Sequence, residues 1–139
     1  VDALRRAVCE AGIDSSTRFL GWRDDINNLM VEADYLVMPS KDEGVPNTVQ
    51  EAMYLGLPVI VSDAGGMPEI VTHGKTGWVV ALDSPEAWAR IITGSCQDRE
   101  TREEISRAAN VYARENFCTE VWGERYCKAL SISGVGVSR

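Results

Sequence analysis

Two short runs of apolar residues, each followed by a loop that contains glycine, constrain the fold of this chain more than any other feature. Tyr35–Met38 and Pro58–Val61 lack the alternation of apolar and polar residues that marks a strand with one face in water. Continuous apolar runs of this length are typical of strands covered on both faces. A third strand is expected at Trp78–Ala81, and helical patterns separate the three runs. The order therefore predicts an α/β fold, a doubly wound parallel sheet with helices on both faces.

The remaining elements follow from helical periodicity and from residues that favour helix ends. A further strand is expected at Thr17–Leu20, before the other three. The predicted helices lie at Asp2–Ala11, from Asp24 and Asp25 through Ala33, at Thr48–Leu55, at Met67–Val71 as a short turn, and from Pro85 to about Leu130 with breaks near Asp98 and Phe117.

Size and composition narrow the class of protein. With 139 residues the chain is long enough for one domain with a single core and too short for two. Its net charge of −7 argues against a nucleic-acid partner, which requires a basic surface, but not against a nucleotide in a local pocket. The chain has no apolar run of the roughly 18 residues that a membrane span needs, and its charged start is unlike a signal peptide. The four cysteines form no Cys-x-x-Cys pair, so we expect reduced thiols in a cytoplasmic protein.

The loop between Tyr35–Met38 and the helix at Thr48–Leu55 carries the candidate site, because parallel sheets bind ligands beyond the carboxyl ends of their strands. Gly44 allows a ligand to approach the backbone, and the following helix start offers unpaired N–H groups that attract an anion such as a diphosphate. Glu43 and Glu51 can face one crevice and accept hydrogen bonds from sugar or ribose hydroxyls. Two structural readings stay open. Glu51 stands at capping-box spacing from Thr48, and Glu43 could be a solvated loop residue.

A longer pattern around this loop resembles a known family. The run Glu43–Met53, continued by Gly56–Ile60, resembles the Glu-x7-Glu signature of family-4-type retaining glycosyltransferases, which have two Rossmann-like domains (the GT-B architecture). The segments that match in order and spacing are Phe19–Gly21, Asp34, Pro39–Ser40, Gly65–Gly66, Pro68–Ile70 and Gly74–Gly77. By this resemblance the chain is identified as the carboxyl-terminal, donor-binding half of such an enzyme.

The resemblance implies a nucleotide-diphosphate sugar as donor, transfer with retained anomeric configuration, and neither a metal nor another cofactor. By motif, Glu43 is the catalytic-site residue that binds donor-sugar hydroxyls, and Glu51 binds the ribose. The backbone around Gly44 and through the next four residues, Val45, Pro46, Asn47 and Thr48, holds the distal phosphate. The loop Gly21, Trp22 and Arg23 is placed near the base, and Lys41 and Arg23 are the nearest cations. The absence of Asp-x-Asp and the single histidine agree with a site that needs no metal.

The resemblance also sets domain limits and open questions. Residues 1–130 are expected to form a Rossmann-like nucleotide-sugar-binding domain, and residues 131–139 a tail. The family's domain begins with a strand and a Gly-x-Gly turn, whereas this chain starts at the following helix. We therefore expect a first strand and an acceptor domain to be missing, and the chain to be inactive alone. The alternative function is a non-catalytic module with the same fold. The complete enzyme could also associate peripherally with a membrane.

A missing first strand is expected to leave unpaired edges on Thr17–Leu20 and Pro58–Val61. Three replacements stay open. The stretch Ala129–Ser138 could supply the strand and a Gly-x-Gly turn, as in a circular permutation. Otherwise the tail is disordered, or another copy of the chain fills the gap.

Overall fold

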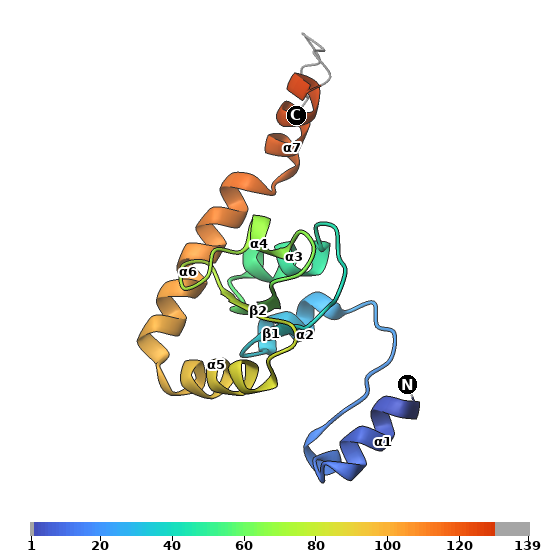
Figure 1. Ribbon diagram of the computed structural model, residues 1–139. Coiled ribbons are helices and arrows are strands. Elements are labelled where there is room, and N and C mark those ends of the chain that lie inside the picture. Colours follow the sequence, from blue (N-terminus) through green and yellow to red (C-terminus); the bar gives the residue numbers. More distant parts are fainter. Residues whose placement is uncertain (1, 130–139) are drawn as a thin grey trace.

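The computed structural model of this protein describes residues 2–129 and contains a parallel sheet of three strands. These are β1 (Leu36–Met38), β2 (Val59–Ser62) and β3 (Trp78–Val80), hydrogen-bonded in the order β1-β2-β3. Figure 1 shows the sheet at the centre of the fold, surrounded by helices. The predicted α/β class, the parallel direction and the three later strands are therefore confirmed.

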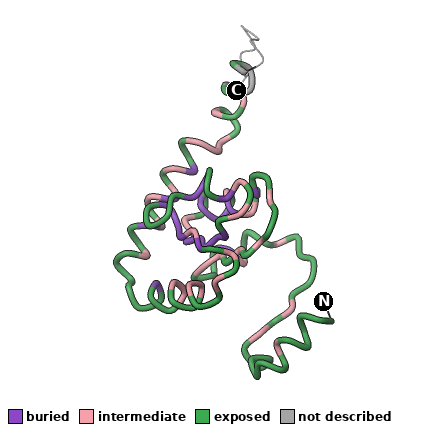
Figure 2. The backbone as a smooth tube through the Cα atoms, viewed as in Figure 1, coloured by how far each residue is buried: buried purple, intermediate pink, exposed green. Residues whose placement is uncertain are grey.

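The central strand β2 is buried on both faces. All four of its residues are inaccessible to solvent, as the continuous apolar run predicts. Val59 and Val61 point to one face, and Ile60 points to the other, where it packs with Trp78 and Ile105. Figure 2 shows the buried segments gathered around this strand. The core therefore has two layers, one on each side of a thin sheet.

Helices cover each face. On one side lie α2 (Ile26–Glu32), α3 (Asn47–Leu55) and the short α4 (Met67–Ile70), which join Val59 and Val61 in the larger apolar cluster. On the other side lies α5 (Pro85–Gln97), which packs with Ile60. The long helix α6 (Arg99–Asn116) contributes to both clusters, and α7 (Thr119–Ala129) extends beyond its end (Figure 1).

The predicted helix breaks fall at helix caps. Asp98 precedes α6, and its carboxylate accepts a hydrogen bond from the Thr101 N–H over 3.0 Å. Phe117 follows the same helix as its carboxyl-terminal cap. Helix α3 ends at Gly56 with φ 76°, a left-handed conformation that glycine adopts without a Cβ penalty. No helix within residues 2–129 is long and apolar enough to cross a membrane.

The expected strand at Thr17–Leu20 is wrong. These residues have no regular structure, and no strand among residues 2–129 pairs with their backbone groups. The preceding elements, α1 (Asp2–Glu10) and the 3-10 turn η1 (Asp14–Ser16), lie apart from the sheet at the end of an extended segment (Figure 1). No residue of α1 is buried.

The expected gap beside Pro58–Val61 is also wrong. Strand β2 pairs with β1 on one side and with β3 on the other, so its hydrogen-bonding groups are used on both edges. The free edge of the sheet at that end belongs to β1 instead. The tail 131–139, and the replacement strand proposed within Ala129–Ser138, lie outside the described residues.

Candidate functional site

The loop 39–46 leads from the carboxyl end of β1 to an open helix start. Pro46 is the amino-terminal cap of α3, and its side chain accepts no hydrogen bond from the helix N–H groups. Among the described residues, none accepts a hydrogen bond from the backbone N–H of Asn47 or Thr48. The first turn of α3 therefore presents free donors and the positive end of the helix dipole to a ligand.

The capping-box interpretation of Glu51 is wrong. A capping box needs Thr48 at the position before the helix, but Thr48 is already the second residue of α3. The side chain of Glu51 is exposed and forms no hydrogen bond or ion pair with the described residues. Its carboxylate is therefore free to accept hydrogen bonds from a ligand.

A cavity of about 410 Å³ lies along the exposed face of α3. It is lined by Asn27, Asn47, Gln50, Glu51, Tyr54, Leu55 and Phe117. The structure thus brings Asn47 and Glu51 into one cavity. The cavity changes in character along its length, from amide and carboxylate groups near the start of α3 to Tyr54, Leu55 and Phe117 near its end.

Sequence analysis missed several residues of this cavity. Gln50 and Tyr54 share a helix face with Asn47 and Glu51, because positions three and four apart lie on one side of a helix. That spacing was the signal that could have identified them. Asn27 from α2 and Phe117 from the end of α6 reach the cavity only through the packing of three helices, which no local pattern reveals.

The Tyr54 side chain is held from its outer side. The Arg114 guanidinium lies 4.6 Å from the centre of the Tyr54 ring, a cation–π contact. The amide of Asn110 also donates a hydrogen bond to the Tyr54 carbonyl. These contacts from α6 fix the wall of the cavity at its apolar end.

Glu43 lies in the loop 39–46 and is half-buried. It is not among the residues that line the cavity beside α3. Of its neighbours, Gly44 and Val45 are exposed and Pro46 is buried. The loop thus exposes residues 44 and 45 to solvent.

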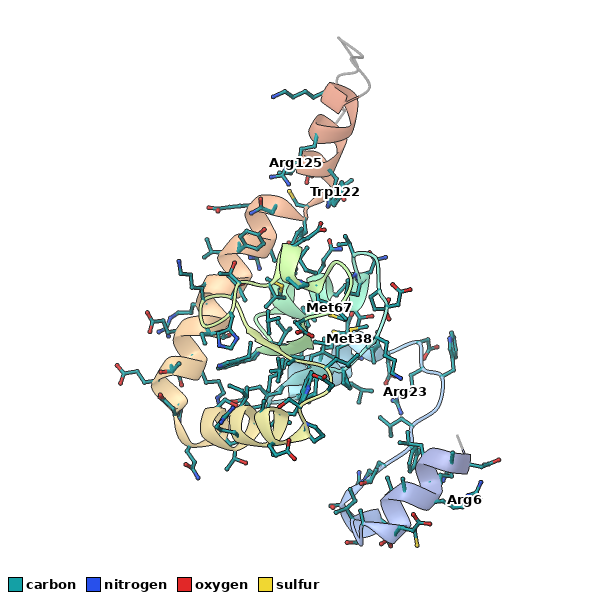
Figure 3. All side chains as sticks on the ribbon, viewed as in Figure 1. Arg6, Arg23, Met38, Met67, Trp122 and Arg125 are labelled. Atoms are coloured by element: carbon teal, nitrogen blue, oxygen red, sulfur yellow. The ribbon has the colours of Figure 1, made fainter. Side chains whose placement is uncertain are left out.

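The predicted cations and base-side residues lie outside the cavity. Arg23 forms an ion pair with Asp25, with Nε 2.6 Å from Oδ1. The hydrogen bond to Asp25, with the charge of that carboxylate, raises the pKa of Arg23, and the same bond lowers the pKa of Asp25. Trp22 is 88% exposed and Gly21 has φ 70°, on the segment between α1 and α2 where Figure 3 places Arg23. Lys41 is exposed and pairs with no acidic group of the described chain.

The ion pair also explains where α2 begins. The expected start at Asp24 and Asp25 is corrected to Ile26, since Asp25 lies outside the helix as its cap residue and makes no side-chain hydrogen bond to it. Its carboxylate is occupied by Arg23 instead. Among the described side chains, no three of His, Cys, Asp or Glu gather where they could hold a metal ion. Three cysteines, Cys9, Cys96 and Cys118, are free thiols, while the side chain of Cys127 lies outside the described part.

Comparisons with known proteins agree on one family. The family described as "Glycosyl transferases group 1" matches residues 2–98. D-inositol 3-phosphate glycosyltransferase of Jonesia denitrificans is 32% identical over 114 residues, which are 81% of this chain and 27% of that protein. The chain therefore spans about a quarter of the length of this relative.

Solved structures give the same result. The crystal structure of Anabaena HepE in complex with UDP has a TM-score of 0.89 and 28% identity, over 94% of this chain and 36% of that one. HepE in complex with UDP-glucose has a TM-score of 0.86 and 27% identity, over the same shares. The carboxyl-terminal domain of a group 1 glycosyl transferase, LpcC of Francisella tularensis, shares the fold with a TM-score of 0.74 at 24% identity, over 85% of this chain and 62% of that one. This chain belongs to the glycosyl transferases group 1 family and corresponds to the carboxyl-terminal domain of its GT-B members.

Proposed function

We propose that this chain is the donor-binding part of a retaining glycosyltransferase that moves a sugar from a nucleoside-diphosphate sugar to an acceptor. One observation carries the proposal. The free N–H groups at the start of α3 lie beside a cavity that also holds the unpaired carboxylate of Glu51. Donors for an anion and an acceptor for hydroxyls, one helical turn apart, match a diphosphate joined to a ribose.

The anion would bind where no side chain competes for it. The backbone at Asn47 and Thr48 donates to phosphate oxygens, and the positive end of the α3 dipole favours their charge. Charge that develops on the leaving diphosphate is stabilised by the same groups. Lys41 is the nearby cation that is free of an acidic partner within the described chain, whereas Arg23 is already paired with Asp25.

The two glutamates would bind different parts of the donor. Glu51 accepts hydrogen bonds from the ribose hydroxyls inside the cavity. Glu43, on the loop and outside that cavity, accepts hydrogen bonds from the transferred sugar. That Glu51 lines the cavity and Glu43 does not supports separate roles. The loop Gly21 to Arg23 borders α2, whose Asn27 lines the same cavity, which supports a position near the base.

The relatives support a nucleotide-sugar donor. HepE of Anabaena, with 27–28% identity over the matched part, has been crystallised with UDP, with UDP and glucose, and with UDP-glucose. For the present chain we therefore propose a nucleoside-diphosphate hexose as donor, and a separate acceptor domain in the complete enzyme. Retention, independence of divalent metal and inactivity of the isolated chain are parts of the same proposal.

The alternative is a module that binds nucleotide sugars without transferring them. The unpaired Glu51 and the open start of α3 serve both functions. The resemblance assigns Glu43 to the catalytic site as well as to the sugar, and its presence favours the enzyme.

Titration calorimetry of the 139-residue chain with UDP, in buffer containing EDTA, tests donor binding without metal. We expect saturable binding that added Mg²⁺ leaves unchanged within about twofold. The complete enzyme is then tested with UDP-glucose and other nucleotide sugars, and the anomeric configuration of the product is read by proton NMR. Binding that requires Mg²⁺, or an inverted product, would contradict the proposed chemistry. Binding without any transfer in the complete enzyme would favour the non-catalytic module.

A further inference from the structure

The loop that carries Glu43 rests against a second loop that sequence analysis did not connect with it. That second segment is the β2–α4 turn, residues 63–66, which follows β2. The N–H of Gly66 donates a hydrogen bond to the Glu43 carbonyl over 2.9 Å. At the end of β2, just before this turn, the Ser62 hydroxyl donates a hydrogen bond to the Ser40 carbonyl over 2.6 Å. The loop 39–46 is therefore fixed at two points along its backbone.

The two backbones touch so closely that only glycine fits. A Cβ on Gly65 would lie 2.1 Å from the Glu43 carbonyl oxygen, and one on Gly66 would lie 2.0 Å from that of Gly44. Gly65 also has φ 59°, which favours glycine on its own account. Gly66, in contrast, has ordinary angles, φ −82° and ψ 3°. At position 66 glycine is thus required only by the contact with the loop.

The β2–α4 turn is itself attached to the core. The Asp63 N–H donates to the Val80 carbonyl over 3.0 Å, and the Asp63 carboxylate accepts from the Leu82 N–H over 3.0 Å. Ser62 is fully buried at the end of β2. The turn therefore fixes the position of the loop 39–46 relative to the sheet.

We propose that Ser62, Gly65 and Gly66 are positioning residues, which set the backbone of Glu43 for the transferred sugar. This inference rests on the proposed role of Glu43. Glu51 is positioned independently, because α3 is anchored by its buried face at Val49 and Met53. The donor is thus held by two separately supported parts, one for the nucleoside and one for the sugar.

This arrangement predicts that the loop 39–46 controls turnover and that α3 controls nucleotide affinity. Cβ atoms do not approach other atoms within 3.0 Å, so a methyl group at position 66 must push the loop away by about 1 Å. A displacement of that size at a reacting centre costs on the order of 100-fold in rate. The proposed phosphate and ribose sites, at Asn47, Thr48 and Glu51, all lie on α3, which its buried face anchors separately. Turnover should therefore fall while nucleotide affinity is retained.

The test compares Gly66→Ala and Ser62→Ala in the complete enzyme. We expect Gly66→Ala to lower kcat on the order of 100-fold. We expect Ser62→Ala, which removes one hydrogen bond and adds no atom, to lower kcat roughly 3- to 10-fold. In both variants the Kd for UDP, measured by calorimetry, should stay within about twofold of the wild type.

Matched controls separate positioning from general stability. Gly94→Ala adds a methyl group in open space, and Ser95→Ala removes a buried hydroxyl that bonds only to the Ile92 carbonyl of its own helix. Neither should change kcat. If Gly66→Ala fails to fold, Ser62→Ala decides alone.

Unchanged kcat in a folded Gly66→Ala variant, or in Ser62→Ala, would overturn the inference. A parallel loss of kcat and UDP affinity would also overturn it, since the two parts would then not be independent. The variant Glu43→Ala tests the proposed role of Glu43 itself, on which the positioning role depends. If that variant keeps full turnover, the proposed role of Glu43 is wrong, whereas its loss beside an unaffected Gly66→Ala rejects only the positioning role.

Discussion

The replacement Glu51→Gln tests the nucleoside site most directly. The Glu51 carboxylate is exposed, lines the cavity and has no partner among the described residues. Replacing this carboxylate therefore breaks no hydrogen bond or ion pair with the described residues. In the complex it would accept two hydrogen bonds from a ribose diol, and a hydrogen bond to a charged group contributes roughly 1.5–3 kcal/mol net.

The substitution keeps one acceptor oxygen and the shape of the side chain, so only part of this free energy is lost. We expect UDP binding to weaken by about 1–3 kcal/mol, which corresponds to a roughly 5- to 150-fold increase in Kd. Calorimetry with UDP measures the change. The control is Glu104→Gln on α6, an exposed glutamate also near the start of a helix and not among the residues that line the cavity.

Two results would refute the reasoning. An unchanged Kd for UDP would mean that Glu51 does not bind the nucleotide. A fall in the midpoint of urea unfolding would mean that the carboxylate supports α3 after all, as the capping-box interpretation proposed. With Pro46 as the cap of α3, we expect the midpoint of Glu51→Gln to match that of the wild type.

Three further predictions concern catalysis, packing and pH. Glu43→Ala should lower kcat at least about tenfold and leave the Kd for UDP nearly unchanged, and equal losses in both would reject its role with the sugar. Met53→Ala empties a fully buried site in the larger cluster and should cost about 2–5 kcal/mol in urea unfolding, against less than ~0.5 for exposed Val111→Ala. The hydrogen bond from Thr101 lowers the pKa of Asp98, so this carboxylate stabilises the fold at neutral pH and stops doing so as the pH falls below its ordinary value of 3.8. The difference in thermal midpoint between wild type and Asp98→Ala should therefore shrink in acid, and a difference independent of pH would reject the helix-cap role.

Local sequence patterns predicted the two strands that are apolar throughout, two helix boundaries and the family motif. The apolar runs at Tyr35–Met38 and Pro58–Val61 identified β1 and β2 within one residue at each end, because a strand buried on both faces must be apolar throughout. Gly56 and Asp98 marked helix boundaries because their backbone and side-chain properties act over only a few residues. The motif from Glu43 to Glu51 identified the family for the same reason: its residues are contiguous.

What sequence could not determine depends on partners distant along the chain. Thr17–Leu20 has the composition of a strand, yet a strand exists only where another pairs with it, and no strand of the described chain pairs with this segment. The place of β2 between β1 and β3 is likewise a property of pairing, and it overturned the unpaired edge expected beside Pro58–Val61.

The candidate site likewise has features that the sequence predicts and features that only packing decides. That Glu51 lies on the helix after the loop could be read from the sequence, because one helical turn fixes its position relative to Asn47. That Asn27 and Phe117 share its cavity was decided only when α2, α3 and α6 packed together. The glycine pair at 65 and 66 was visible as a turn, but its contact with Glu43 and Gly44 joins two loops more than twenty residues apart. Sequence alone thus determined which groups the chain carries and which lie next to each other on one element, whereas tertiary structure decided which elements meet, because packing between elements depends on the whole core.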